Sequence, residues 1–161
     1  GVLDGAHISV LIECWRTSGV PPDEYSPEGS EPLNQFQGRI KEFLEGRLLE
    51  DVSAIDSSEP IKVVLVSHGA PVREIIKYFY TFGHKSWAAV GDQVRRLPPN
   101  ISLNEFVVHF EETQCPDTGT AKRRITTVEC VLLHDLSHLT EEMKDSAIRL
   151  QPMYAIEKKL E

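Results

Sequence analysis

The sequence predicts an α/β protein of one domain that contains a parallel sheet. A continuous apolar run of strand length, KVVLV at residues 62–66, is typical of a strand buried on both faces of such a sheet. This run leads through Ser-His-Gly directly into a helical pattern, which makes half of a βαβ unit. Two segments with alternating apolar residues, 105–110 and 125–134, then predict a β-hairpin. With 161 residues, 40% of them hydrophobic, the chain is long enough to bury one core.

Two helices separated by a loop are predicted in the first third of the chain. Apolar residues from 8 to 15 recur at helical spacing, and Gly19 follows where such a helix would end. Residues 19–32 concentrate proline, glycine and acidic groups, as loops do. We expect Ser30 to cap the next helix, whose apolar residues keep helical spacing from 33 to about 50.

After a polar connection at 51–60, the pattern predicts a strand, a tight turn and a third helix. Pro71 suits the first turn of that helix. Its buried stripe is expected to contain Val72, Ile75, Ile76 and Phe79. Arg73, one turn into this helix, is expected on a solvated face, with anion binding as the alternative. Beyond an irregular stretch, the polar segment 115–124 forms the long tip of the predicted hairpin.

Charge and composition exclude several classes of protein. The formal net charge of −8 argues against a nucleic-acid binder, because phosphate backbones require a basic surface. Three cysteines without Cys-x-x-Cys spacing suggest neither a disulfide framework nor a zinc site. No apolar run is long enough to span a bilayer, so we expect a cytoplasmic protein with no membrane partner. Nothing in the composition indicates a metal or another cofactor.

His68 is the main candidate for chemistry. It lies at the carboxyl end of a predicted parallel strand, where open α/β sheets bind ligands. There it either ends the strand with a local hydrogen bond or binds an anion such as a phosphoryl group. In the second case the backbone amides of Gly69 and Ala70, at the start of the helix, would bind the same anion.

Other polar residues have a structural and a functional interpretation, and the sequence leaves both open. Glu31 either favours the dipole of the following helix or lies behind a site and is oriented toward it. Asn100 follows two prolines, so it either shapes a turn or makes a polar contact near a pocket. His134 and His138 have a spacing that binds zinc on helices, but they follow a strand pattern without a clear third ligand. His109 is expected at the surface.

Several motifs, taken in order, resemble the histidine phosphatase (phosphoglycerate mutase-like) superfamily. They are GVLDG, SPEGSEPLNQF, VVLVSHGAPVREIIKYF, PPN with EFVVHFEE, and ITTVECVLLHDLSHLTEE. Together they look most like the TIGAR-type fructose-2,6-bisphosphatases, and the resemblance covers residues 1 to about 142. It implies a three-layer α/β/α fold with a mostly parallel sheet.

The resemblance also assigns roles to residues of this chain. His68 would be the second active-site histidine, which donates to phosphoryl oxygens. Glu31 matches the glutamate of the family's glycine-rich loop, and Asn100 matches the asparagine of its Pro-Asn loop. The family commonly has Thr-Gly after that asparagine, whereas this chain has Ile101 and Ser102, which places the geometry of the loop in question.

Two groups that the family's mechanism requires are missing from the sequence. The family forms a phosphohistidine on an Arg-His-Gly motif of the first strand and uses an upstream glutamate as the acid. None of the six histidines follows an arginine. We therefore expect residues 1–161 to be a single incomplete domain that lacks the N-terminal strand and is inactive alone.

The proposed activity of the complete protein is hydrolysis of a small phosphorylated substrate, with fructose-2,6-bisphosphate expected. The alternatives are a non-catalytic short form that binds a phosphorylated ligand or a partner, and a phosphoglycerate mutase or broad phosphatase. Without a neighbouring strand, KVVLV would be an unpaired apolar edge. The sequence thus predicts marginal stability or association, and it leaves the oligomeric state open.

Overall fold

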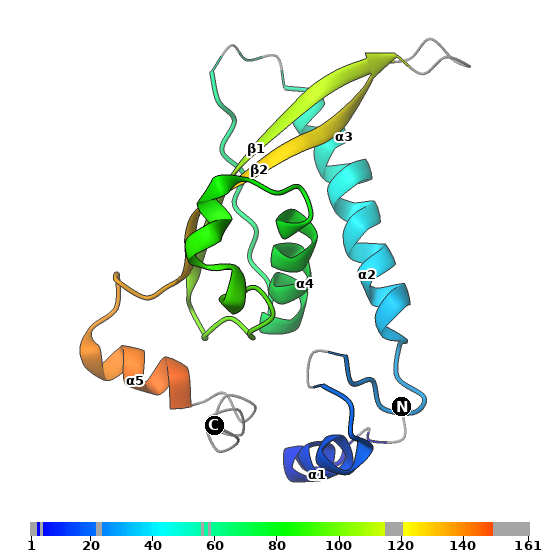
Figure 1. Cartoon of the computed structure of the whole chain (residues 1–161), viewed down its shortest axis with the longest axis vertical. Coiled ribbons are helices and arrows are strands. Elements are labelled where there is room, and N and C mark those ends of the chain that lie inside the picture. The colour runs from blue at the N-terminus through cyan, green and yellow to red at the C-terminus, as the bar shows by residue number, and fades with distance from the viewer. Residues whose placement is uncertain are drawn as a thin grey trace.

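A computed structural model of the chain describes residues 3, 5–21, 24–55, 57, 59–114 and 121–149. Figure 1 shows one long hairpin with several helices packed beside it. In chain order the elements are α1 (Ile8–Ser18), α2 (Leu33–Glu42), η1 (Phe43–Leu48), α3 (Leu49–Ser53), α4 (Gly69–Tyr80), η2 (Lys85–Ala89), η3 (Gly91–Gln93), β1 (Leu103–Gln114), β2 (Ala121–Asp135) and α5 (Glu141–Arg149). No helix within these described ranges is both long and apolar enough to cross a bilayer.

The first helix forms as predicted. His7 precedes α1, and its Nδ1 accepts from the backbone N–H of Ser9 at 3.3 Å. Gly19 ends the helix in the left-handed conformation, at φ +71°, which a glycine adopts without strain. The expected helix boundary at Gly19 is confirmed.

The second predicted helix is one continuous helical segment from residue 33 to 53, with a π-helical section, η1, in its middle. The prediction that Ser30 caps it is wrong. The hydroxyl of Ser30 donates to the carbonyl of Pro27 at 2.6 Å instead. Pro32 precedes the helix, and its carbonyl accepts from Gln35 and Phe36. The helix therefore starts without a side-chain cap.

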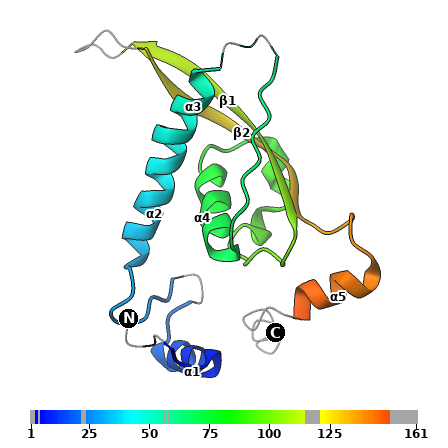
Figure 2. The same cartoon turned by 180° about the vertical axis from the view of Figure 1, so that it is seen from behind.

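Residues 62–67 do not form the predicted strand. They run extended toward the start of α4 without a ladder partner (Figure 2). Val64 is 85% exposed and Val66 is 94% exposed. A strand requires a neighbour to bond its backbone groups, and the only sheet among the described residues consists of β1 and β2. The mostly parallel three-layer sheet is therefore absent from this part of the chain, although the mixture of helices and strands agrees with an α/β protein.

The predicted hairpin is confirmed. β1 and β2 pair antiparallel, with Val108 opposite Val128, and register shifts interrupt the ladder in three places. Residues 115–120 of the predicted tip lie outside the described residues. Helix α5 was not predicted from the sequence.

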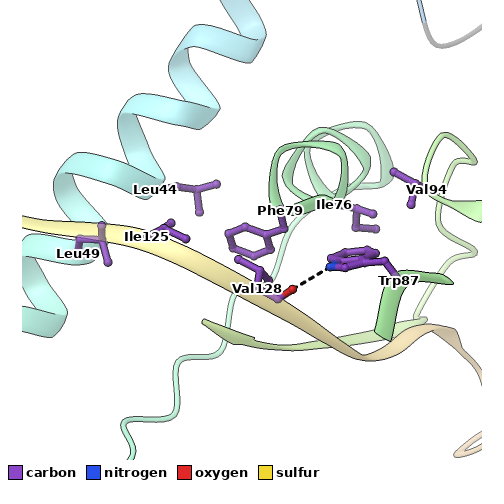
Figure 3. Close-up of a cluster of buried hydrophobic side chains, with 8 residues drawn as sticks. All are labelled: Leu44, Leu49, Ile76, Phe79, Trp87, Val94, Ile125 and Val128. Carbon is purple, nitrogen blue, oxygen red and sulfur yellow. Dashed lines mark hydrogen bonds between the residues drawn. The ribbon is translucent and has the colours of Figure 1, made fainter. Parts of the chain in front are cut away.

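The core lies where α4, the segment η1–α3 and η2 pack against β2 (Figure 3). Its buried side chains are Leu44, Leu49, Ile76, Phe79, Trp87, Val94, Ile125 and Val128. The indole N–H of Trp87 donates to the carbonyl of Val128 at 2.8 Å, which ties η2 to the hairpin. Ile76 and Phe79 of the predicted stripe are buried in this core, and Val72 and Ile75 pack against it. The position of α4 is thereby fixed from its apolar side.

Candidate active site at the start of helix α4

His68 immediately precedes α4 and has extended backbone, with φ −88° and ψ 164°. Its carbonyl accepts from Val72 at 3.1 Å and thus closes the first helical turn. Its imidazole makes no capping hydrogen bond and is exposed. The interpretation of His68 as a locally bonded strand end therefore has no support in the side-chain contacts. The ring is accessible to a ligand.

The first turn of α4 offers two backbone donors beside His68. The amides of Gly69 and Ala70 have no intrahelical acceptor because of their position, and Pro71 carries no N–H. The first turn contains no acidic residue that would compete with a bound anion for the positive end of the helix dipole. The two amides and the adjacent imidazole are therefore all available as hydrogen-bond donors.

The loop around Asn100 packs against this helix end at Gly69. A Cβ at Gly69 would lie 3.2 Å from Cδ1 and Cγ of Leu97, so the glycine permits a close approach of the loop. Asn100 is exposed in the turn that follows Leu97. Ile101, at one of the positions where the sequence departs from the family, has φ +55°, a conformation that strains a β-branched residue.

Glu31 lies in the loop before α2 and binds Arg39. The guanidinium of Arg39 donates from Nε to Oε1 at 2.7 Å and from Nη2 to Oε2 at 2.6 Å, which makes a bidentate pair. The hydrogen bonds from Arg39 hold the pKa of the Glu31 carboxyl below its ordinary value. Glu31 is therefore ionised in this arrangement, and it shares no hydrogen bond with His68.

Helices α2 and α4 are joined by a partly buried polar contact that the sequence did not predict. Glu74 is only 3% exposed, and its Oε2 accepts from Nε2 of Gln37 at 3.0 Å. Arg73 donates from Nε to Oε1 of Glu74 at 3.1 Å, and Lys77 lies 3.2 Å from Oε2. The prediction that Arg73 lies on a solvated face is wrong, because its side chain is buried.

The reason for this burial is that α4 is covered on two sides. Its apolar stripe faces the hairpin, while α2 and η1 cover the face that carries Glu74. One turn beyond Glu74, the hydroxyl of Tyr78 donates to Oε1 of Glu45 in η1. Burial, followed by the neighbouring Glu45, raises the pKa of Tyr78. Helical spacing identifies one apolar face and cannot show that a second element covers the opposite face.

The contacts at Gln37–Glu74 and Glu45–Tyr78 run in the same direction along both helices, so α2 and α4 are parallel. They begin at the same end of the molecule (Figure 1). The structure thus joins His68, Gly69 and Ala70 directly, packs the loop of Asn100 against them, and places Glu31 at the same end through α2.

The zinc alternative finds no support. His134 is the second-last residue of β2 and has φ +54°. Its backbone N–H donates to Oδ1 of Asn104 at 2.8 Å, and its Nε2 is buried without a partner. Burial, and secondly the charge of Arg96, lowers the pKa of His134 to about 4. Within the described residues no three histidine, cysteine, aspartate or glutamate side chains gather to hold a metal. His109 is exposed as predicted and contacts Glu129 at 2.7 Å.

Comparison with curated proteins supports the resemblance predicted from the motifs. Fructose-2,6-bisphosphatase TIGAR of Xenopus tropicalis is 25% identical over 187 residues, which cover 91% of this chain. The chain resembles the TIGAR-type histidine phosphatases. TIGAR B of Danio rerio is 25% identical over 91% of the chain, and TIGAR of Bos taurus is 24% identical over 86%.

The chain spans a little under two thirds of the length of these TIGAR relatives, from 63% to 65%. This partial match is consistent with the predicted C-terminal part of such a phosphatase. No family model matches the chain, and no solved structure matches it either.

Proposed function

We propose that residues 1–161 are one incomplete domain, the C-terminal portion of a histidine phosphatase that hydrolyses a sugar bisphosphate, fructose-2,6-bisphosphate in particular. In this proposal the phosphoryl group passes from the sugar oxygen to a histidine outside this sequence and then to water. An acid outside this sequence protonates the departing sugar alkoxide. The chain described here supplies the groups that bind the phosphoryl oxygens.

His68 has the central part in this proposal. Its imidazole N–H and the amides of Gly69 and Ala70 donate to the phosphoryl oxygens that carry charge in the transition state. Asn100 contributes a polar contact from the neighbouring loop. Glu31, ionised beside Arg39, can still accept a hydrogen bond from a sugar hydroxyl.

The single observation that carries the proposal is the arrangement at the start of α4. An exposed imidazole without a capping bond is followed by two amides without intrahelical acceptors. The ordered resemblance to TIGAR adds an independent reason to assign phosphate chemistry to that arrangement.

The test is a titration of the 161-residue chain with inorganic phosphate and with fructose-2,6-bisphosphate, followed through the ring resonances of each histidine. We expect the His68 ring to respond and the response to disappear in His68→Ala. His138→Ala is the matched control, because His138 is also exposed but lies in the turn after β2. A His68 ring that stays unchanged at every phosphate concentration would contradict the proposal.

The same chain is expected to show no turnover. Hydrolysis of fructose-2,6-bisphosphate above the His68→Ala background, or phosphohistidine on the isolated chain, would show that a nucleophile is present after all. The absence of an Arg-His-Gly motif favours one second candidate, a non-catalytic protein that binds a phosphorylated ligand. Tight binding of the bisphosphate without turnover, unchanged when an Arg-His-Gly segment of a TIGAR relative is joined upstream, would favour that candidate.

A further inference from the structure

A salt bridge connects two loops that are distant in sequence and lie at the proposed site. Nη2 of Arg95 donates to Oε1 of Glu24 at 2.6 Å, across 71 positions of the chain. Arg95 is two residues before Leu97, whose side chain packs against Gly69 at the start of α4. The loop that contains Glu24 is therefore tied to the loop that touches the phosphate-binding turn.

Glu24 lies two positions before residues 26–31, a stretch closed by its own hydrogen bonds. The hydroxyl of Ser26 donates to the carbonyl of Glu31 at 3.0 Å, and the N–H of Ser30 donates to the carbonyl of Pro27 at 3.1 Å. A displacement of Glu24 is thus transmitted to Glu31 through a short, internally bonded stretch of chain.

A second set of contacts connects this loop to α4 through α2. Glu31 binds Arg39 in α2, and Gln37 of α2 binds Glu74 in α4. Most residues from 24 to 31 are exposed and none is buried, so little apolar packing holds this loop in place. Its position depends on polar contacts at its two ends, one of which is Arg95–Glu24.

We propose that Arg95 is a positioning residue, which acts through Glu24 to hold Glu31 at the end of the molecule where His68 lies. The inference rests on the proposed function, since Glu31 contacts the sugar part of a bisphosphate there. Arg95 itself does not touch the substrate. The pair is an exposed one, with side chains 61% and 49% accessible, so its removal should alter the loop far more than the stability of the fold.

The first test needs no ligand. Amide hydrogen exchange is measured at Ser30 in the loop and at Val128 in the core. In Arg95→Ala we expect Ser30 to exchange roughly two- to fivefold faster, the range an exposed ion pair supports, with Val128 unchanged. Arg95→Lys should restore much of the protection, as should the exchanged pair Glu24→Arg with Arg95→Glu.

Arg16→Ala is the matched control. Arg16 forms a 3.0 Å pair with Glu13 in α1 at 61% and 63% accessibility, and it should leave Ser30 unaffected. Equal acceleration at Ser30 and Val128 in Arg95→Ala would show a general loss of stability and would overturn the assignment. An unchanged Ser30 would overturn it as well.

The second test uses the two ligands of the phosphate titration. Arg95→Ala should weaken binding of fructose-2,6-bisphosphate roughly two- to fivefold and leave binding of inorganic phosphate unchanged, because only the sugar meets Glu31. Equal affinities for the bisphosphate in both proteins would refute the role of Arg95. Failure of the unaltered chain to bind phosphate at His68 would instead refute the proposed function, and the exchange measurement would then decide the role of Arg95 alone.

Discussion

Oε2 of Glu74 accepts a hydrogen bond from Nε2 of Gln37 at 3.0 Å, inside the contact between α4 and α2. The carboxylate is buried, and the two cations beside it, Arg73 and Lys77, come from its own helix. A buried carboxylate is costly unless it is paired, so this group depends on every one of its partners. The contact also sets how α2 lies against the helix that begins at His68.

Glu74→Ala is expected to destabilise the protein by about 3 kcal/mol, because it leaves the buried Arg73 without its counter-charge. Gln37→Ala should cost about 1 kcal/mol, the net value of one hydrogen bond. Urea unfolding followed by tryptophan fluorescence measures both. An equal, small effect of the two substitutions would show that Glu74 is solvated in solution.

The exposed valines of residues 62–67 predict association. Val64→Asp together with Val66→Asp should lower the tendency to form dimers or larger species, since it places charge on an apolar extended segment with unpaired backbone. Sedimentation velocity over a range of concentrations measures the change. Val10→Asp in α1 is the control, because Val10 is also exposed but lies in a helix with bonded backbone. If the unaltered chain is monomeric at high concentration, the prediction is contradicted.

The elements that the sequence predicted correctly are those whose signals are local. Gly19 ends α1, Pro71 lies in the first turn of α4, and the alternation in β1 and β2 specifies a hairpin whose partners are close in sequence. Residues 62–67 carry a strong strand pattern, but a pattern does not supply the neighbour that a strand needs. The apolar run alone led to the prediction of a buried strand, and the described residues contain no neighbour for it.

The candidate site also contains some contacts that the sequence predicts and others that it does not. His68, Gly69 and Ala70 are adjacent in sequence, so the turn that joins them was predictable. The contacts Gln37–Glu74 and Arg95–Glu24 join residues far apart in the chain, and single charged residues give no sign of such partners. Burial of Arg73 and Glu74 was missed because helical spacing takes no account of a second covering helix.

His134 predicts a loss of stability in mild acid. Its pKa in the folded protein is lowered to about 4, whereas an unfolded histidine takes up a proton near its ordinary value of 6.5. Stability from the neutral ring is therefore fully present above that ordinary value and is lost as pH falls toward 4. Between pH 7 and 5 we expect a loss of about 1 kcal/mol, after discounting for partial contact with solvent.

His134→Asn is the variant for this test, since asparagine tolerates the left-handed backbone at this position and does not titrate. Its stability should be nearly constant from pH 7 to 5 where that of the unaltered chain declines. Urea midpoints at pH 7, 6 and 5 make the comparison. Parallel curves for the two proteins would assign the acid sensitivity to other groups.

Gly69→Ala tests whether the close approach of the two loops matters for the proposed site. The added methyl would lie 3.2 Å from Leu97, so the loop of Asn100 must move by a few tenths of an ångström. We expect a stability loss of about 1 kcal/mol or less, because helix propensity favours alanine over glycine and partly offsets the crowding. The free energy of phosphate binding at His68 should change by more than the free energy of unfolding does.

Gly38→Ala is the matched control, because a Cβ at Gly38 in α2 meets no atom within 4 Å. It should gain the helix propensity without the crowding, and phosphate binding should not change. Leu97→Ala in the Gly69→Ala background removes the crowded side chain and should restore part of the binding. If Gly69→Ala binds phosphate as tightly as the unaltered chain, the spacing between α4 and the Asn100 loop does not control the site.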